Sequence, residues 1–120
     1  MAAPQSAPIQ TVEEIAVLVT AALCLKRPIS AIYNEHRRSL CPYVLGRNKQ
    51  GDLRVLCYQY GGRSSTGLSP TGSPDNWRCI VLPKLRGVRL LDDPWIKLDR
   101  HTQPQTCIAD VLFDTEKLDL

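Results

Sequence analysis

The sequence predicts a mainly β domain of the α+β class, in which one N-terminal helix precedes a small antiparallel barrel or strongly bent sheet. Three observations lead to this prediction. An apolar segment near the N-terminus carries helix-start signals, five or six short apolar segments follow at strand spacing, and turn-forming residues separate them. The chain of 120 residues is long enough to bury a core, and we expect a single domain over residues 11–120.

The helix is predicted at residues 11–26. Thr11 is followed three residues later by Glu14, a spacing typical of a capping box in which each side chain binds the other's backbone amide. From Val12 onward the apolar residues recur at helical spacing and cover nearly every side of the segment. A helix of this kind is buried or forms half of an interface.

The helix is expected to end before Pro28, with Lys26 and Arg27 in its last turn, where cations suit the helix dipole. Residues 1–10 contain two prolines and no basic residue, which predicts a disordered start and not a secretory signal. The longest charge-free apolar stretch, Ile15–Leu25, has eleven residues, too few to span a membrane.

Short strands are expected from residue 29 onward, in a β region over residues 29–95 with a C-terminal extension over residues 96–120. Leu53–Tyr60 is apolar on both faces apart from two residues, which predicts an interior strand. Asn48–Asp52 reads as a hairpin turn, with Gly51 at a position that needs a positive φ. Strands are predicted at 29–34, 40–46, 53–60, 77–82 and 84–91, a polar link at 35–38, and a last strand or short helix at 106–113.

One long polar loop, Gly61–Asn76, separates two of the apolar segments. Twelve of its sixteen residues are Gly, Ser, Thr or Pro, so the loop cannot form a core. Loops of this length in small domains are usually functional or disordered. We therefore expect a scaffold that carries the loop free at its rim.

The five cysteines, at positions 24, 41, 57, 79 and 107, are at least sixteen residues apart. The absence of a CxxC pair argues against a zinc ribbon or a thioredoxin-like motif, and no metal or cofactor is predicted. Cys57 and Cys79 lie inside apolar segments, where a thiol behaves as a small hydrophobe. The prediction is unpaired thiols in a reducing cytoplasm, with a single disulfide as the alternative.

Two groups of residues are candidates for ligand binding. Arg63 and Ser64 follow two glycines, whose backbone lets a ligand approach closely, and the arginine can hold a carboxylate or phosphate. Trp77 and Arg78 open the next strand, where indole and guanidinium together can stack on a base and bind its phosphate, and Tyr58 offers a second ring for stacking. The structural alternatives are a flexible turn for the first group and core packing for the aromatic residues.

Charge is distributed unevenly along the chain. Residues 26–54 carry seven Lys or Arg against two acids, whereas residues 92–120 carry seven acids against three Lys or Arg. This asymmetry can steer an anionic partner toward the first half. The cluster His36-Arg37-Arg38 can contact phosphate, but a solvated connector is the favoured interpretation.

The order of several segments resembles the WYL domain family. The resemblance covers Cys41–Trp95 and is clearest at Pro42-Tyr43 and at Leu90–Trp95. Leu53-Arg54-Val55 stands where the family has its Trp-Tyr-Leu signature. The resemblance implies an SH3-like β-barrel and a regulatory or ligand-sensing role, with nucleic acid or a nucleotide-like effector as the ligand.

The function predicted from these patterns is a non-enzymatic, cytoplasmic module that binds a small anionic or nucleotide-like ligand, or nucleic acid. A first alternative is an interaction or oligomerisation subunit, such as a homodimer formed through the helix. A second is a thiol-dependent enzyme, for which Cys41 with His36 is one pairing. The predicted ligand-binding residues are Tyr58, Arg63, Ser64, Trp77 and Arg78.

Overall fold

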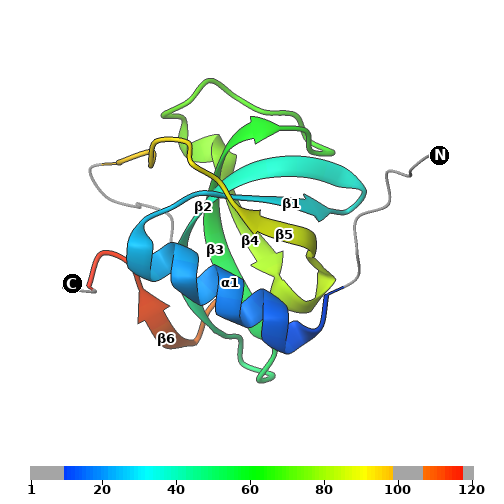
Figure 1. Cartoon of the computed structure of the whole chain (residues 1–120), viewed down its shortest axis with the longest axis vertical. Coiled ribbons are helices and arrows are strands. Elements are labelled where there is room, and N and C mark those ends of the chain that lie inside the picture. Colours follow the sequence, from blue (N-terminus) through cyan, green and yellow to red (C-terminus); the bar gives the residue numbers. More distant parts are fainter. Residues whose placement is uncertain (1–9, 99–106, 118–120) are drawn as a thin grey trace.

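The computed structural model of the chain describes residues 10–98 and 107–117. One helix, α1 (Val12–Leu25), lies across a strongly bent antiparallel sheet (Figure 1). The strands are β1 (Ile29–Tyr33), β2 (His36–Arg47), β3 (Leu53–Gly62), β4 (Trp77–Val81), β5 (Arg86–Leu90) and β6 (Asp110–Asp114), and the 3-10 helices are η1 (Pro74–Asn76) and η2 (Leu82–Lys84).

The strand order is β4-β3-β2-β1-β5, and β6 pairs with the second half of β2. The predicted class, a mainly β fold with a bent antiparallel sheet and one N-terminal helix, is confirmed. The closed barrel is wrong, because β4 and β5 stand at the two ends of the strand order and do not pair within the described chain. The unpaired edge of β4 faces the β1–β2 hairpin across an open seam, which residues of both line.

The capping box predicted for α1 is present. The Thr11 hydroxyl accepts from the Glu14 amide at 3.1 Å, and the Glu14 carboxylate accepts from the Thr11 amide at 2.8 Å. The predicted C-terminus is corrected: Lys26 has a left-handed φ of 52° and ends the helix, so neither predicted cation lies in the last turn. Arg27 instead pairs with Asp92 at 2.7 Å.

The first hairpin also differs from its prediction. Residues 35–38 were expected as a polar link, but β2 begins at His36. The reason is a two-residue turn in which Asn34 and Glu35 both have positive φ, at 49° and 67°. That geometry matches the twist of the flanking strands and lets pairing resume at once. The predicted Asn48–Asp52 turn is confirmed, with Gly51 at φ 87°.

The other boundaries differ little from the predictions, and residues 110–114 form a strand, β6, and not a helix. The fifth strand begins late, at Arg86, because Leu82–Lys84 form the turn η2. β3 lies between β2 and β4, as its apolar pattern predicts. Most of the segment predicted as disordered lies outside the described residues, but Gln10 is fixed by hydrogen bonds to Val88.

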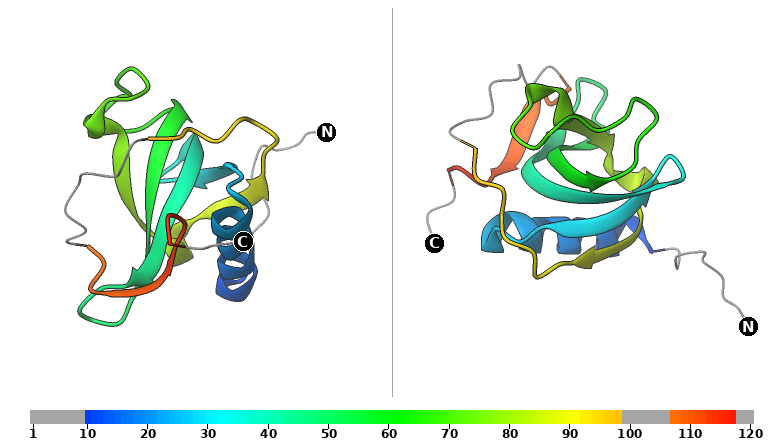
Figure 2. Two further views of the ribbon diagram at one scale, coloured as in Figure 1. Left: turned by 90° about the vertical axis from the view of Figure 1, so that its left-hand side faces the viewer. Right: turned by 90° about the horizontal axis from the view of Figure 1, so that it is seen from above.

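The sheet buries both faces. We call the first the helix face: α1 packs on it with Ile15, Val19, Ala22 and Leu23. The second is the C-terminal face, where Trp95, Ile96 and Leu98 pack against buried residues of β2 and β3. Two further views show α1 lying along one side of the bent sheet and β6 beside the end of β2 (Figure 2).

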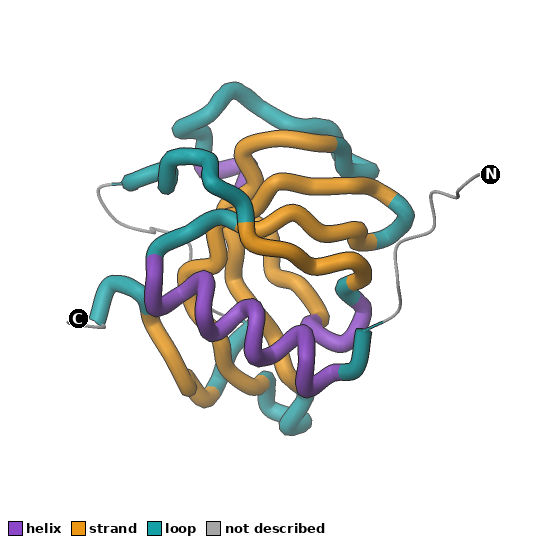
Figure 3. The backbone as a smooth tube through the Cα atoms, viewed as in Figure 1, coloured by secondary structure: helices purple, strands orange, loops and turns teal. Residues whose placement is uncertain are grey.

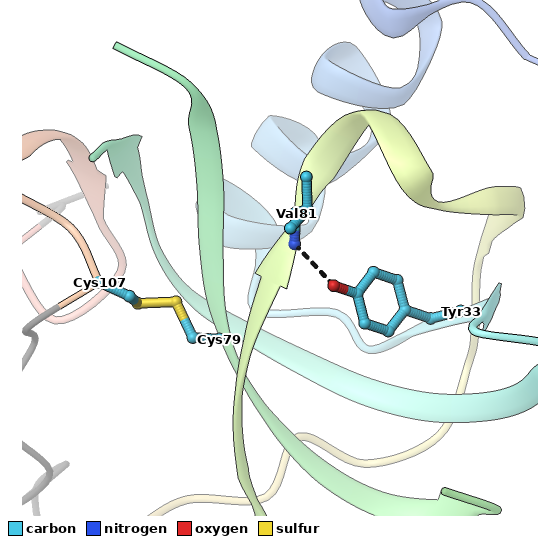
Figure 4. The surroundings of a disulfide bond; sticks show 4 residues. All are labelled: Tyr33, Cys79, Val81 and Cys107. Atoms are coloured by element: carbon cyan, nitrogen blue, oxygen red, sulfur yellow. Dashed lines mark hydrogen bonds between the residues drawn. A yellow bond between two sulfur atoms is a disulfide. The ribbon is translucent and has the colours of Figure 1, made fainter. Parts of the chain in front are cut away.

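Side chains cap the two open ends of the sheet. The Gln10 amide bonds both the N–H and the C=O of Val88 in β5, at 2.8 and 3.0 Å. The Tyr33 hydroxyl accepts from the Val81 amide of β4 at 3.1 Å (Figure 4). Unpaired strand edges are sites of aggregation unless they are protected. These contacts therefore stabilise an open sheet where a barrel would have closed.

Candidate functional site

The loop after β3 is folded and lies at one end of the sheet (Figure 3). Asn76 is fully buried, and its side-chain amide pairs with the backbone of Ser69 through bonds of 2.8 and 2.9 Å. The Tyr58 hydroxyl donates to the Ser73 carbonyl at 2.8 Å and accepts from the Gly72 amide at 2.7 Å. Buried side chains therefore hold the loop in one conformation, so the loop is structured before any ligand binds.

This arrangement corrects the predicted stacking role of Tyr58. Its ring is fully buried, and its edge meets Trp77 at a centroid distance of 5.1 Å. Trp77 also meets Tyr43 at 5.0 Å, so its ring belongs to the aromatic core of the C-terminal face. A ring inside the core cannot stack on a ligand base, and the structural alternative holds for Tyr58.

Arg78 also has a different role from the one predicted. A guanidinium has five N–H donors, and those of Arg78 make five hydrogen bonds within the protein. Arg78 thus anchors the loop to β4. Because its donors are already used, it would act on a ligand mainly through its positive charge. The acceptors are Gln59 Oε1 at 3.2 Å, Asp75 O at 2.6 Å, Trp77 O at 3.3 Å, Ser64 Oγ at 3.4 Å and Gly67 O at 3.0 Å.

The sequence interpretation missed Arg38, which it assigned to a solvated connector. Its side chain is only 4% exposed. Its Nε donates to the Tyr33 carbonyl at 3.3 Å, and its guanidinium lies over the Tyr33 ring, 5.2 Å from the centroid. Its Nη1 donates to Gln59 Oε1, also at 3.3 Å. The other three N–H groups of Arg38 have no acceptor among the described residues.

Two cations therefore share one neutral oxygen. Gln59 is fully buried, and its amide nitrogen donates to the carbonyls of Gly61 at 2.9 Å and Arg63 at 3.1 Å, which turns its oxygen toward Arg38 and Arg78. Burial, and next the charge of Arg78, lower the pKa of Arg38. No acidic side chain in the described ranges forms an ion pair with either arginine. The site thus holds positive charge that the protein does not neutralise.

These arginines line a cavity of about 330 Å³, which we call the seam pocket because it opens between β4 and the β1–β2 hairpin. Three of the five predicted site residues, Ser64, Trp77 and Arg78, lie in its wall. Arg63 is exposed and does not line the cavity, although its backbone helps to orient Gln59. The remaining lining residues are Tyr33, Asn34, Arg38, Ser65, Thr66, Cys79 and Ile80.

The chemistry of the seam pocket favours an oxyanion. A buried guanidinium with unused donors binds carboxylate or phosphate oxygens through short, charge-assisted hydrogen bonds. The hydroxyl groups of Ser65 and Thr66, at the loop wall, add further donors. A second signal was available in the sequence: Gln59 is a polar residue inside an interior strand, and a buried amide needs polar partners.

The prediction of five unpaired thiols is wrong for two of them. Cys79 and Cys107 form a disulfide, and in Figure 4 it lies on the side of β4 away from Tyr33. The bond joins the edge strand to the segment that leads into β6. Their separation of 28 residues gave no signal of pairing, because only the return of the C-terminal segment brings them together.

The other three cysteines are free. Burial raises the pKa of Cys41 to about 11 and also raises that of Cys57. A buried thiol with a raised pKa is a poor nucleophile. Cys24 is half-buried on α1. Disulfides are typical of oxidising compartments and rare in a reducing cytoplasm. The cytoplasmic location expected from the sequence therefore stays a prediction.

Within residues 10–98 and 107–117, no group of three or more His, Cys, Asp or Glu side chains is placed to hold a metal ion. The same part of the chain contains no helix with the length and apolar character that a membrane crossing requires. Comparisons of the chain with protein-family models, with curated proteins and with solved structures find no match.

Proposed function

We propose that this protein is a non-enzymatic, ligand-sensing module that binds a small anionic or nucleotide-like ligand in the seam pocket. The observation that carries the proposal is Arg38, a buried cation with three unused donors and no acidic partner in the described structure. Charged groups that are buried without a counter-ion are unfavourable. A bound anion removes that penalty.

The roles in the seam pocket follow from the contacts. Arg38 binds the oxyanion directly, and Arg78 adds charge while it holds the loop wall. Ser64, Ser65 and Thr66 border the ligand, and Trp77 also lines the cavity. A cavity of about 330 Å³ suits a ligand no larger than a mononucleotide or the end of a nucleic-acid chain. The resemblance to WYL domains points to the same class of ligand.

The test compares two neighbouring arginines. Adenosine monophosphate and short single-stranded oligonucleotides are titrated calorimetrically at low salt against the wild type, Arg38→Gln and Arg37→Gln. Arg37 is exposed and donates to Ser30 at 2.8 Å, so its variant is the matched control. Loss of a charge-assisted bond weakens binding by roughly tenfold or more in Arg38→Gln, whereas Arg37→Gln binds as the wild type does. A wild type that binds neither ligand contradicts the proposal, and so does a folded Arg38→Gln that binds equally well.

A homodimer formed through α1 is the second candidate function. Val17 and Leu25 are 67% and 58% exposed on the helix, although both are large and apolar. An apolar helix face that the sheet does not cover favours a partner. Light scattering over a range of concentrations tests this candidate: a monomer at every concentration removes it, and Val17→Glu should dissociate any dimer. The thiol-enzyme alternative has no supporting observation among the four cysteines that are buried or disulfide-bonded.

A further inference from the structure

A second cavity lies at the opposite end of β3, beside the turn between β2 and β3. We call it the hairpin pocket. Its volume is about 310 Å³. The lining residues are Asn48, Lys49, Gln50, Arg54 and Cys107. None of these is acidic, and two are cationic.

Arg54 is the unusual member of this set. Its Nε is buried and has no hydrogen-bond partner. Nearly all buried polar atoms in proteins are hydrogen-bonded, and a buried donor without a partner destabilises the folded state. Arg78 shows the usual situation in this protein, since all its donors are used. Among residues 10–98 and 107–117 nothing accepts from this donor, so an acceptor bound from outside these residues would satisfy it.

The nearest acidic residue along the chain does not supply that acceptor. The Asp52 carboxylate accepts from the Asn48 side-chain amide at 3.5 Å, and it forms no ion pair with Arg54. Lys49 is exposed beside the same cavity and adds a second positive charge. The hairpin pocket is therefore cationic, and its cations are not neutralised by the residues that line it.

The frame around Arg54 is rigid before any ligand arrives. The Asn48 side-chain oxygen accepts from the amides of Gln50 at 3.0 Å and Asp52 at 2.9 Å. The Gly51 amide closes the turn onto the Asn48 carbonyl at 3.0 Å, and its φ of 87° favours glycine there. On the other side, the disulfide to Cys79 fixes Cys107. A preformed site loses little conformational entropy when it binds.

We propose that the hairpin pocket is a second anion-binding site, which takes a small oxyanion of the phosphate type. The Arg54 guanidinium donates to the oxyanion, and the Lys49 ammonium adds charge at the rim. The Gln50 side-chain amide, which has no partner within the described ranges, provides a further donor. This site is separate from the seam pocket, and it stands or falls independently of the function proposed there.

The test follows backbone amide signals by NMR while inorganic phosphate is added at constant ionic strength. Amides of Lys49, Gln50 and Gly51 should shift and saturate at millimolar phosphate. Lys49→Gln and Arg54→Gln should each weaken this response, the second by roughly tenfold or more. Arg38→Gln should leave the response of the turn unchanged, which separates the two pockets. Arg54→Gln keeps a polar group in place, and Lys49→Gln alters only an exposed side chain, so we expect at least the second variant to fold.

Three outcomes overturn the proposal. The first is the absence of a saturable shift at the turn in the wild type. The second is a response in both Lys49→Gln and Arg54→Gln that equals the wild-type response, and the third is loss of the response in Arg38→Gln. A second titration with glycerol 3-phosphate identifies the form of the ligand. Saturation with both compounds assigns a phosphate monoester as an acceptable ligand, and saturation with inorganic phosphate alone assigns the free ion. Failure at the turn with retained nucleotide binding at Arg38 would remove this inference and leave the proposed function intact.

Discussion

The helix face and the C-terminal face of the sheet are buried in different ways, although strand β3 serves both. On the helix face, Val55 and Cys57 of β3 belong to one core cluster with residues of α1, which precedes the strand in the chain. On the C-terminal face, Leu56 and Tyr58 meet a segment that returns from much later in the chain. That segment is held by specific tethers: the Cys79–Cys107 disulfide, the bond of 2.6 Å from the Tyr43 hydroxyl to the Ile96 carbonyl, and the bond of 2.7 Å from the Thr115 hydroxyl to the Leu23 carbonyl.

The comparison teaches that an apolar helix packs over one face, whereas the segment that packs over the other face is also held by a small number of specific bonds. The seam pocket and the hairpin pocket each lie with one of these two faces of the sheet. Gln59 points toward the helix face, where it orders Arg38 and Arg78. Arg54 lies beside Cys107, at the border of the C-terminal face. Changes to the helix face should therefore unfold the whole domain, and changes to the tethers should loosen one side first.

The largest effect is expected from Leu23→Ala on the helix face. Leu23 is fully buried in the core of α1 and the sheet. Removal of such a side chain lowers the free energy of unfolding by about 3 kcal/mol, because transfer and cavity terms add. Urea denaturation measures the loss. Val17→Ala on the exposed side of α1 is the control, and a similar loss in both variants would contradict the assigned helix face.

Removal of the disulfide should have the next largest effect, and it should act on the other face. The cysteines are 28 positions apart in the sequence, for which loop closure sets an upper value of about 3.6 kcal/mol, and the paired variant Cys79→Ser/Cys107→Ser should lose somewhat less, about 3 kcal/mol. Amide exchange should rise first in β6, while α1 keeps its protection. Cys24→Ser controls for the loss of a thiol. Uniform loss of protection in both elements would show that the two faces unfold as one unit.

The contrast between the faces also explains what the sequence could predict. The capping box of Thr11 and Glu14, the turn at Gly51 and the interior position of β3 are local patterns, and all three are confirmed. The start of β2 was missed because Asn34 and Glu35 form a turn without the glycine that usually marks it. The open seam was missed because strand spacing does not report whether the end strands meet.

The site was predicted in part for the same reason. Ser64, Trp77 and Arg78 were found because they stand next to the loop in the sequence. Arg38 was missed because it comes from β2 and reaches the pocket only through the bend of the sheet. The orphaned donor of Arg54 and the Cys79–Cys107 bond likewise depend on tertiary contacts. Spacing along the chain carries no trace of such contacts.

Asn76→Ala tests whether the loop wall belongs to the seam pocket. The variant removes the paired bonds to Ser69, and it should lower the free energy of unfolding by about 2 kcal/mol because buried backbone groups lose their partner. Binding at Arg38 should weaken as the wall loosens. Asp75→Ala is the control, because the bonds of Asp75 to Ser73 and Arg78 use its backbone. Unchanged binding in Asn76→Ala would separate the loop from the site.

Alkaline pH should distinguish the faces through Cys41, which is buried on the C-terminal face. Burial raises the pKa of this thiol from 9.0 to about 11. Between these values the folded state holds a proton that the unfolded state has lost, so stability falls as pH rises from about 9 to about 11. The effect is on the order of 1–2 kcal/mol. Cys41→Ala should reduce this slope and leave the part that belongs to Cys57, whose pKa burial also raises, and an identical slope in the variant would contradict the assignment.

The smallest effect is expected at the open seam between β4 and the β1–β2 hairpin. Tyr33→Phe keeps the ring beneath Arg38 but removes the hydroxyl that accepts from the Val81 amide. The loss should be about 1 kcal/mol, because water can replace the acceptor at a strand edge. Faster exchange of the Val81 amide, with no change at the Leu56–Cys79 pairing inside β4, would show that the hydroxyl caps only the edge. If the Val81 amide of the variant exchanges at the wild-type rate, packing protects this edge of β4, and the Tyr33 hydroxyl is not needed as a cap.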